Sequence, residues 1–535
     1  MPTHSAGAVA DLAPGQMRTA DAGGTEVLLC NVDGAITALH PRCTHYGAPL
    51  VDGELNGFRV VCPWHHACFD ARTGRHVEAP GCDALASYPV EVRDGEAFVT
   101  LPDDVGDGQR PNPMARPAVG GGEAGRLPYL VVGGGPAGAH AVEGLRQGGY
   151  DGPITLVTAE PHLPYDRTQV SKGFLTGDRP AGRMPLRGAD FYAELGVDVL
   201  TGTVVERVDA KAHRAHLAGG GRIDYAKACV ATGSTARTLD VPGARLPAIY
   251  TVRTWEDAEA VRAAAGEYTS VVVVGASFIG MEAAMALAGM GCEVTVVSPE
   301  EVPFGKTFGA RVGRAVQRWQ EGLGVAFRLG EQVEGFEGIR KVTGVKLGGG
   351  EVLPASFVVV GIGVSPNSDL IEGLPPGPDG GIPVDEHGYA GYDLYVAGDI
   401  ASAPQDADGS RARIEHWRVA AQQGTVAGNN MAGAARALRS VPYFWTNQAG
   451  HNLRYAGHHG EVDNIVFDGR PEDGPFIAYY LEGDRVAAAL GYKCDRDLVA
   501  IHELMWLGAM PAAGELDPGA DWSGVLRVVG RGAEA

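Results

Sequence analysis

The sequence lacks the features that would place it at a membrane, in a secretory pathway or on nucleic acid. It contains no apolar run of about 18 residues, the length needed to cross a bilayer. Its N-terminal segment lacks the basic flank and apolar core of a secretory signal. Lys and Arg number 44 against 65 Asp and Glu, and the formal net charge is −21. We therefore expect a soluble, cytoplasmic protein that binds neither membranes nor nucleic acid, because phosphate backbones attract clusters of basic residues.

Cysteine is scarce and unevenly placed, with five of the 8 cysteines falling within the first 82 residues. In a reducing compartment such clustering favours metal binding over disulfides. Glycine is abundant instead, at 79 of 535 residues, which suits tight turns around bound cofactors. A chain of this length is expected to form three or four domains.

The residue composition and pattern change twice along the chain. Short β-rich runs and turns up to residue 101 predict a small all-β domain, and the Gly- and Pro-rich stretch after it predicts a flexible linker. From residue 128 a strand, a glycine turn and a helix occur, and the plan repeats near residue 268. We predict an all-β domain at 1–101, a linker at 102–126, a Rossmann-type α/β domain in two parts at 127–245 and 366–440, a second α/β domain inserted at 246–365, and a C-terminal α+β domain at 441–535.

Two Cys/His pairs in the N-terminal domain have metal-ligand spacing. They are Cys43-Thr-His45 and, after sixteen intervening residues, Cys62-Pro-Trp-His65. The pattern C-x-H and C-x-x-H is typical of a Rieske [2Fe-2S] centre, in which Cys43 and Cys62 would bind one iron and His45 and His65 the other. The alternatives are a zinc site with the same ligands, or buried cysteines beside unrelated histidines.

The segments CTHYGAPL and CPWHHACFD resemble the cluster-binding loops of ferredoxin-type Rieske domains. Respiratory Rieske proteins carry an extra cysteine in each loop, where this chain has Ala48 and Trp64. High-potential members usually place a hydrogen-bonding serine where this chain has Ala67. Fewer hydrogen bonds to the cluster sulfides imply a lower potential. We interpret His66 as a surface residue rather than a further ligand.

A first dinucleotide motif, G-x-G-x-x-G, is formed by Gly133, Gly135 and Gly138. At a strand-to-helix turn it lets backbone N–H groups approach a pyrophosphate. Glu160, at the end of the next β-rich run, is suited to bind ribose hydroxyls. The alternative is a glycine turn that serves only packing.

The second motif reads Gly275-Ala-Ser277-Phe-Ile-Gly280, with serine in place of the middle glycine. At the end of the following strand Ser298 replaces the usual acidic residue, and Glu300 and Glu301 follow. Serine tolerates a 2′-phosphate, but the two glutamates would repel it, so we expect NADH to be preferred over NADPH.

Four further segments resemble the flavin-contacting segments of putidaredoxin reductase and of ferredoxin reductases from ring-hydroxylating dioxygenase systems. In chain order they are PYDRTQVSKGFL, VATGSTAR, DLYVAGDIA and IEHWRVAAQQG. The resemblance implies FAD. It implies cofactor-binding roles for Arg167 and Lys172 beside the isoalloxazine, Thr232 and Gly233, Asp399 at the ribityl or phosphate region, Glu415, His416 and Trp417 along the ring, and Trp445 flanking the flavin from the C-terminal domain.

The same resemblance implies that Glu282 pairs with Lys172 near the nicotinamide end of the flavin, as the catalytic pair. The alternatives are an exposed helical glutamate, and for Trp445 an ordinary core tryptophan. No C-x4-C follows the first glycine motif, so a redox-active disulfide is not expected to take electrons from the flavin.

Apart from its first twenty residues and the linker, the chain resembles the Rieske-bearing members of the apoptosis-inducing-factor family. The resemblance implies a reductase, monomeric or homodimeric, that moves electrons from NADH (or NADPH) through FAD to the Rieske cluster and on to a protein such as an oxygenase or a cytochrome P450. The linker would let the cluster dock at the flavin and swing away. The alternatives are a redox-sensing NADH-binding flavoprotein, and a flavin reductase acting directly on an organic substrate or oxygen.

Overall fold

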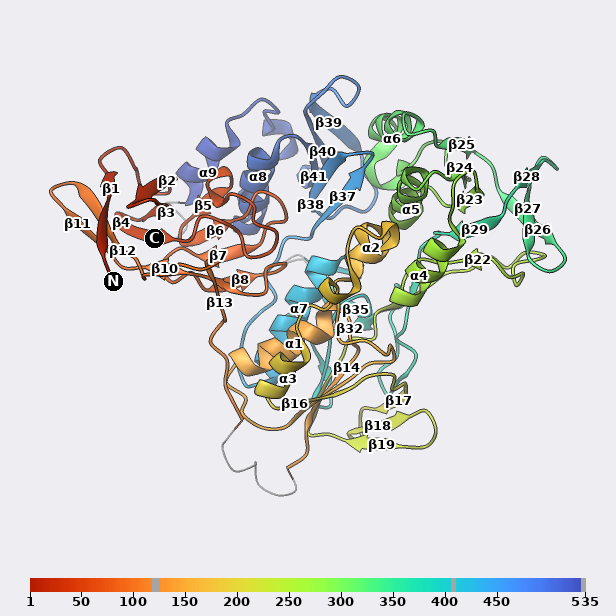
Figure 1. Ribbon diagram of the computed structural model, residues 1–535, viewed down its shortest axis with the longest axis horizontal. Helices are drawn as coiled ribbons and strands as arrows, with labels where there is room; N and C mark the ends of the chain where they lie inside the picture. The colour runs from red at the N-terminus through yellow and green to blue at the C-terminus, as the bar shows by residue number, and fades with distance from the viewer. Residues whose placement is uncertain (118–125, 406–409, 531–535) are drawn as a thin grey trace. The chain divides into compact units, whose positions relative to one another are not determined.

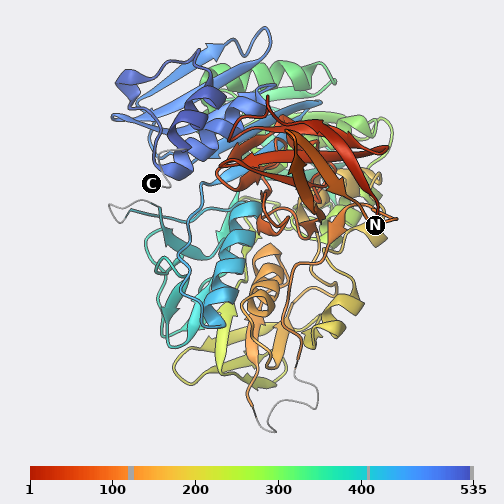
Figure 2. The same cartoon turned by 90° about the vertical axis from the view of Figure 1, so that its left-hand side faces the viewer.

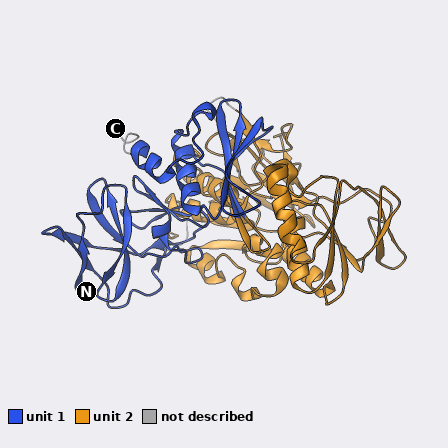
Figure 3. Cartoon of the chain, turned by 90° about the horizontal axis from the view of Figure 1, so that it is seen from above, with its two compact units in different colours: residues 1–114, 439–445, 453–535 blue, residues 115–438, 446–452 orange. Residues whose placement is uncertain are grey.

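The computed structural model describes residues 1–117, 126–405 and 410–530. They form two compact units (Figure 3), each described here by itself. One unit contains residues 1–114, 439–445 and 453–535, and the other contains residues 115–438 and 446–452. Within the described ranges, no helix is long and apolar enough to cross a membrane.

The N-terminal domain is all-β, as predicted, and its strands are drawn in red and orange in Figure 2. Its sheets have the orders β1-β12-β11, β10-β4-β3-β2, β5-β6-β7-β8 and β13-β9. The strands are β1 (Thr3–Ala8), β2 (Met17–Ala22), β3 (Thr25–Val32), β4 (Ala35–Leu39), β5 (Glu54–Asn56), β6 (Arg59–Val61), β7 (Cys68–Asp70), β8 (His76–Glu78), β9 (Ala84–Leu85), β10 (Ser87–Tyr88), β11 (Val90–Arg93), β12 (Glu96–Thr100) and β13 (Gln109–Arg110).

Strand β3 explains why this small domain holds together. Side chains alternate between the two faces of a strand, and both faces of β3 are apolar. Leu28 and Cys30 pack into a core that reaches the two predicted cluster loops, whereas Val27 and Leu29 pack into a second core behind β12. One strand therefore joins the cluster-binding half of the domain to the other half.

Several residues of the stretch predicted as a linker, 102–126, make hydrogen bonds to other parts of the chain. Strand β13 adds to the N-terminal domain, and the Asn112 side chain donates to the carbonyl of Cys82 at 3.0 Å. Ala115 N–H then bonds to the carbonyl of Arg146 at 2.7 Å. These hydrogen bonds anchor Asn112 and Ala115 to folded parts of the chain. Residues 118–125 lie outside the described ranges.

The first Rossmann-type domain contains a six-stranded sheet of order β16-β15-β14-β20-β34-β33, parallel except for the edge strand β33. Helices α1 (Pro136–Gln147) and α7 (Trp417–Met431) lie side by side (Figure 1). Its strands are β14 (Tyr129–Val132), β15 (Ile154–Val157), β16 (Val197–Leu200), β20 (Lys227–Val230), β33 (Tyr389–Gly391) and β34 (Leu394–Val396). Smaller elements are α2 (Gly173–Thr176), α3 (Ala189–Glu194), β17 (Val205–Asp209), β18 (Arg214–Leu217), β19 (Arg222–Asp224), β21 (Ser234–Ala236), β30 (Val364–Pro366), β31 (Ile371–Glu372), β32 (Ile382–Pro383), β35 (Ala401–Pro404) and β36 (Arg411–Ala412).

The second Rossmann-type domain contains a parallel sheet of order β22-β29-β23-β24-β25, built from near-continuous Val runs as expected for strands covered on both faces. Its elements are β22 (Ile249–Tyr250), α4 (Trp255–Ala264), β23 (Ser270–Val274), α5 (Phe278–Gly289), β24 (Glu293–Ser298), α6 (Gly305–Glu321), β25 (Ala326–Leu329), β26 (Val333–Gly338), β27 (Val342–Leu347), β28 (Val352–Pro354) and β29 (Phe357–Val360).

The C-terminal domain is a five-stranded sheet of order β37-β38-β41-β40-β39 with two helices packed on it. Helices α8 and α9 also contact β5 of the N-terminal domain (Figure 1). The elements are β37 (Tyr443–Gln448), β38 (His451–Gly457), β39 (Asn464–Gly469), β40 (Phe476–Glu482), β41 (Arg485–Tyr492), α8 (Asp495–Leu507) and α9 (Trp522–Gly530). The tip of the β37–β38 hairpin, residues 446–452, belongs to the unit that contains the Rossmann-type domains.

A buried charge network joins the N-terminal and C-terminal domains within their shared unit. The Arg59 guanidinium binds the Glu503 carboxylate through Nε to Oε2 at 2.8 Å and Nη2 to Oε1 at 3.2 Å. Asn56 donates to Oε2 at 2.8 Å, and Nδ1 of His502 lies 3.1 Å from Oε1. The Glu503 side chain is fully buried and that of Arg59 is 5% exposed. The two domains therefore form one packed body.

Candidate cofactor sites

The two predicted cluster loops adopt the same turn. In each loop the cysteine N–H bonds to the carbonyl five residues later, and the N–H four residues later bonds back to the cysteine carbonyl. The residue four after the cysteine has a left-handed backbone in both loops, at Gly47 (φ 74°) and at His66 (φ 55°). The hydrogen-bonded pairs are Cys43–Ala48 and Gly47–Cys43 in the first loop, and Cys62–Ala67 and His66–Cys62 in the second.

The four predicted ligands lie together as two pairs. Nδ1 of His45 is 3.1 Å from Nδ1 of His65, and the buried thiols of Cys43 and Cys62 are hydrogen-bonded to each other. No group of three or more His, Cys, Asp or Glu side chains able to hold one metal ion occurs among the described residues. One pair of thiols and one pair of imidazoles is the donor set that a two-iron Rieske cluster requires, whereas a structural zinc needs four ligands around one ion. The residues present thus fit the cluster.

Backbone N–H groups surround the two sulfur atoms. Burial alone raises the pKa of the Cys62 thiol, but hydrogen bonds from Cys43 and from the N–H groups of Trp64 and His65 outweigh it and lower the pKa below its ordinary value. The hydrogen bond to Cys62 and burial raise the pKa of Cys43, while two backbone N–H groups of its own loop oppose that shift. Such N–H donors stabilise thiolate sulfur, which is the form that binds iron.

Trp445 lies against the cluster loops. Its ring centroid is 4.3 Å from that of His65 and 6.2 Å from that of His45, all in the same unit. The prediction that Trp445 flanks the flavin stays a prediction. The structure adds a contact with a proposed iron ligand, which the sequence did not indicate.

His66 is fully buried, so its interpretation as a surface residue is wrong. Its ring stacks on Tyr443 with centroids 3.8 Å apart and meets the ring of His502 edge-on at 4.7 Å. Both partners come from the C-terminal domain. A sequence without a map of long-range contacts gives no sign that a histidine in a cluster loop is covered by another domain.

The first glycine turn packs closely at two glycines and is open at the third. A Cβ on Gly133 would lie 2.1 Å from the carbonyl oxygen of Ala231, and one on Gly138 would lie 1.8 Å from the carbonyl oxygen of Gly133. These two glycines are therefore needed for close packing of strand and helix. A Cβ on Gly135, at the N-terminus of α1, would meet nothing within 4 Å. The open space at that helix end suits the pyrophosphate of a dinucleotide.

The second glycine turn repeats this geometry. A Cβ on Gly275 would lie 2.2 Å from the carbonyl oxygen of Gly361, and one on Gly280 would lie 2.1 Å from that of Gly275. Ser277 occupies the position equivalent to Gly135 with extended backbone angles (φ −116°, ψ −165°). Any residue adopts such angles, so serine replaces the middle glycine there without backbone strain.

Glu160 and Arg167 form a partly buried ion pair, and Tyr165 Oη donates to Glu160 at 2.6 Å. Arg167 also donates to Tyr165 Oη at 2.9 Å and to the carbonyl of Arg253 at 2.8 Å. The structure thus places Arg167 beside the carboxylate predicted to bind ribose. The prediction that Arg167 and Lys172 lie beside the isoalloxazine stays a prediction.

Lys172 and Glu282 come together as predicted. Lys172 Nζ lies 2.6 Å from Glu282 Oε2, which also accepts the Ser171 hydroxyl at 2.6 Å. Thr446 Oγ1 donates to the other oxygen, Oε1, at 2.9 Å. The Glu282 side chain is only 4% exposed, so the alternative of an exposed helical glutamate is wrong.

A directed hydrogen-bond chain, here called the polar clasp, supports Glu282 through Gln320, Gln448 and Thr446, all buried. Gln320 Nε2 donates to the carbonyl of Met281 at 3.0 Å and to Gln448 Oε1 at 2.6 Å. Gln448 Nε2 then donates to Thr446 Oγ1 at 2.9 Å. Because an amide nitrogen only donates, the Thr446 proton is left to point at Glu282. Sequence reasoning missed these residues, since Gln320 and Gln448 meet only through the tertiary fold.

Most of the remaining predicted flavin residues make hydrogen bonds or ion pairs with other residues of the same unit. The Asp399 carboxylate accepts from Arg253 Nη2 at 2.8 Å, and a Cβ on Gly233 would lie 3.9 Å from Asp399 Oδ2. Thr232 Oγ1 donates to the carbonyl of Asn367 at 2.7 Å. Glu415 pairs with Arg413, and His416 and Trp417 form the N-cap and first residue of α7.

Ser298 and the two glutamates that follow it are predicted to lie near the adenosine ribose of NAD(P)H. Ser298 is buried, and its hydroxyl accepts the Glu300 N–H at 3.3 Å. Glu300 also lies 3.5 Å from the exposed Lys306 ammonium. The serine hydroxyl is thus engaged with the backbone of this loop.

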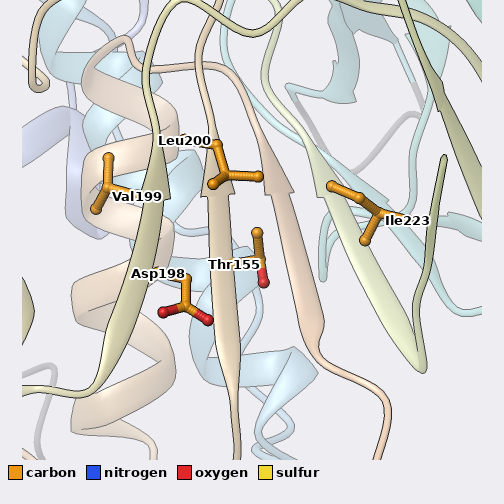
Figure 4. Close-up of a pocket in the computed structure, with 5 residues that line it drawn as sticks. All are labelled: Thr155, Asp198, Val199, Leu200 and Ile223. Atoms are coloured by element: carbon orange, nitrogen blue, oxygen red, sulfur yellow. The ribbon is translucent and has the colours of Figure 1, made fainter. Parts of the chain in front are cut away.

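A separate pocket of about 290 Å³ contains none of the predicted site residues (Figure 4). It lies at β15 and β16, and its lining residues are Thr155, Asp198, Val199, Leu200 and Ile223. One carboxylate among mainly apolar side chains offers no donor set for a cofactor, and we assign this pocket no role.

Comparison with known proteins decides the family. Residues 127–424 match pyridine nucleotide-disulphide oxidoreductase, residues 3–89 match the Rieske [2Fe-2S] domain and residues 443–523 match the reductase C-terminal domain. The chain belongs to the pyridine nucleotide-disulphide oxidoreductase family. It is an FAD-dependent NAD(P)H oxidoreductase with a Rieske [2Fe-2S] domain. None of its eight cysteines, all within the described ranges, forms a disulfide.

Individual relatives support this placement. Apoptosis-inducing factor 3 from Homo sapiens is 36% identical over 94% of this chain and 83% of its own length. The anthranilate 1,2-dioxygenase system ferredoxin–NAD(+) reductase component from Burkholderia cepacia is 34% identical over 73% of this chain and 97% of its own length. In the covalent putidaredoxin reductase–putidaredoxin complex, a chain with 28% identity superposes with a TM-score of 0.70 over 77% of this chain and 100% of that chain.

Proposed function

We propose that this protein passes electrons from NADH through FAD to its own Rieske cluster and from there to an external one-electron acceptor protein. The contact between Trp445 and His65 carries the proposal, because it joins the reductase C-terminal domain to a predicted iron ligand at 4.3 Å. Bound FAD supplies the conversion of a two-electron hydride into single electrons. The chain holds the cofactors and excludes water.

A local feature of the structure supports each proposed role. Glycine turns and helix N-termini bind the two pyrophosphates, with Glu160 at the FAD ribose. Glu282 keeps Lys172 in place, with the ammonium 2.6 Å from the carboxylate, and this pair would lie at the reacting end of a bound flavin. Cys43, Cys62, His45 and His65 hold the two irons.

The external acceptor is proposed to be an oxygenase, a cytochrome P450 or a similar protein. The names of two relatives associate those proteins with a dioxygenase system and with putidaredoxin. The dioxygenase-system reductase covers 73% of this chain, whereas the present chain also carries an iron-sulfur domain of its own. The Rieske domain would thus take the place of a separate ferredoxin.

A ligand variant tests the route without removing a domain. In full-length Cys43→Ala protein the cluster should be lost, while NADH reduction of FAD and of ferricyanide should stay within twofold of wild type. Reduction of cytochrome c should fall at least tenfold, because the one-electron exit is missing. Cys82→Ala, a change of the same type at a half-buried thiol of this domain, is the matched control. Unchanged cytochrome c reduction in a cluster-free Cys43→Ala protein would favour a sensing role or direct reduction at the flavin.

A further inference from the structure

His66 has a backbone conformation that glycine normally supplies. It follows the proposed ligand His65 directly, has φ 55° and is fully buried. At the equivalent position of the first cluster loop the chain uses Gly47, with φ 74°. A residue with a side chain in the left-handed region is uncommon, and one that persists there is held by its surroundings. Glycine would fit this turn without a side chain, so the contacts of the His66 ring are what distinguish the second loop from the first.

The ring of His66 is packed between residues of the C-terminal domain. Tyr443, from β37, stacks on it at 3.8 Å with an interplanar angle of 22°. His502, from α8, meets it edge-on at 4.7 Å and 84°. Tyr443 and His502 are themselves fully buried. The second cluster loop is thereby inserted into the C-terminal domain through one side chain.

The residue on the other side of His65 is held by the same domain. The carbonyl oxygen of Trp64 accepts hydrogen bonds from Tyr443 Oη and from Arg454 Nε, both at 2.9 Å. The two neighbours of His65 are thus fixed by β37, β38 and α8, and its ring lies against Trp445. A loop held at both flanks leaves the imidazole between them little freedom to reorient.

We propose that His66 is a positioning residue that locks the second cluster loop onto the C-terminal domain and so fixes the His65 imidazole for the Rieske cluster. The inference rests on the proposed ligand role of His65. The C-terminal domain then acts on the cluster through the loop, and the geometry of the histidine-bound iron depends on residues more than 370 positions away in the sequence.

Two substitutions distinguish the effect of the His66 ring from the effect of its left-handed backbone. Asparagine and glycine both accept the left-handed conformation, so His66→Asn and His66→Gly remove the ring while the turn is kept. In full-length protein with the cluster bound, amide hydrogen exchange across residues 62–67 should become at least tenfold faster. The EPR g-values of the reduced cluster and its midpoint potential should shift, since the imidazole is no longer held. Unchanged exchange, g-values and potential in both variants would overturn the proposal.

His213 offers a matched control. It also has a left-handed backbone (φ 52°) and its ring stacks against a tyrosine, Tyr225, at 5.5 Å, but it lies in β-hairpin structure of the other unit. His213→Gly should leave the exchange of residues 62–67 and the cluster spectrum unchanged. A shift of the same size in this variant would show that the effect is unspecific, and would overturn the proposal.

A substitution of Tyr443, the residue that stacks on His66, tests the proposal if the His66 variants do not fold. Tyr443→Leu removes the stacking partner and one hydrogen bond to Trp64 while leaving the loop sequence intact. It should give the same faster exchange and spectral shift, and wild-type values would overturn the proposal. If wild-type protein lacks a Rieske EPR signal, the ligand assignment fails instead, and amide exchange alone then decides whether His66 locks the loop.

Discussion

Replacing Arg59 by methionine removes the charge that makes the buried Glu503 tolerable. The Glu503 side chain is fully buried, and Arg59 supplies two of the hydrogen bonds to its carboxylate. Breaking a buried ion pair by removing one partner destabilises by about 3–5 kcal/mol. For a cooperative unit of this size, about 2–4 °C of melting temperature corresponds to 1 kcal/mol, so Arg59→Met should melt about 6–20 °C lower at pH 7.

The assay is thermal unfolding followed by circular dichroism, with cluster and flavin absorbance recorded to identify the unit that melts. Arg93→Met is the control, because Arg93 pairs with Glu91 on the surface of the same domain. It should change the melting temperature little. The double variant Arg59→Met, Glu503→Leu should regain part of the loss, because apolar side chains replace both charges of this pair, although Glu78 still loses its partner Arg59. A melting temperature of Arg59→Met equal to that of wild type would refute the argument.

The effect of Arg59→Met should depend on pH. In wild type, burial alone would raise the pKa of Glu503, but Arg59 and the hydrogen bond with His502 outweigh it and hold the pKa well below its ordinary value. A carboxyl with a lowered pKa stabilises the folded state above its unfolded pKa, about 4.3, and loses that contribution as the pH falls below it. Without Arg59, burial should raise the pKa of Glu503 above its ordinary value. As the pH falls, Glu503 should therefore become protonated, and neutral, at a higher pH in the variant than in wild type. The stability difference should narrow from pH 7 to pH 5.

Further predictions concern the flavin, the nicotinamide and the cluster. Thr446→Val should slow reduction of FAD by NADH about tenfold in stopped-flow traces while FAD stays bound, because one oxygen of Glu282 loses its donor, and Thr446→Ser should restore the rate. NADH should be preferred over NADPH by kcat/KM, and Glu300→Gln with Glu301→Gln should narrow the preference; equal use of the two by wild type would contradict the charge argument. Since alanine stands at position 67, the cluster potential should lie in the lower part of the Rieske range, from about −150 mV, and a titrated value near the upper limit would disprove this.

The sequence predicts the domain order because each domain carries a local signature. The glycines at 133, 138, 275 and 280 lie where a Cβ would strike backbone within 2.2 Å, so the strand–turn–helix plan leaves no other residue at those positions. The four proposed cluster ligands were found in the same way, from spacing within two short loops.

What the sequence could not predict depends on contacts between distant segments. The polar clasp joins Gln320 and Gln448, which are 128 residues apart, and neither stands in a recognisable motif. His66 was misread because its environment is supplied by Tyr443 and His502. The hydrogen bond from Asn112 to Cys82 was not expected, because composition describes only the local preference of the chain.

The packed interface changes how electrons are expected to reach the cluster. Val61 and Cys68 of the N-terminal domain form an apolar cluster with Val499 of α8, next to the buried Arg59–Glu503 pair. Separating the domains would expose this surface together with the ring of His66. We therefore expect the Rieske domain to stay packed on the C-terminal domain during electron transfer, and not to swing on a tether of its own.

Solvent viscosity distinguishes a docked cluster from a swinging one. Large domain motions through solvent take microseconds to milliseconds and slow as viscosity rises, whereas transfer between fixed centres does not require them. After rapid mixing with NADH, the rate of cluster reduction should be the same in buffer and in sucrose of about threefold higher viscosity, once any effect on flavin reduction is subtracted. Arg59→Met, which loosens the interface, should introduce a viscosity dependence. A wild-type rate that falls in proportion to viscosity would show that the domain leaves its interface in each turnover, and the buried charge network would then be a resting contact that the working enzyme breaks.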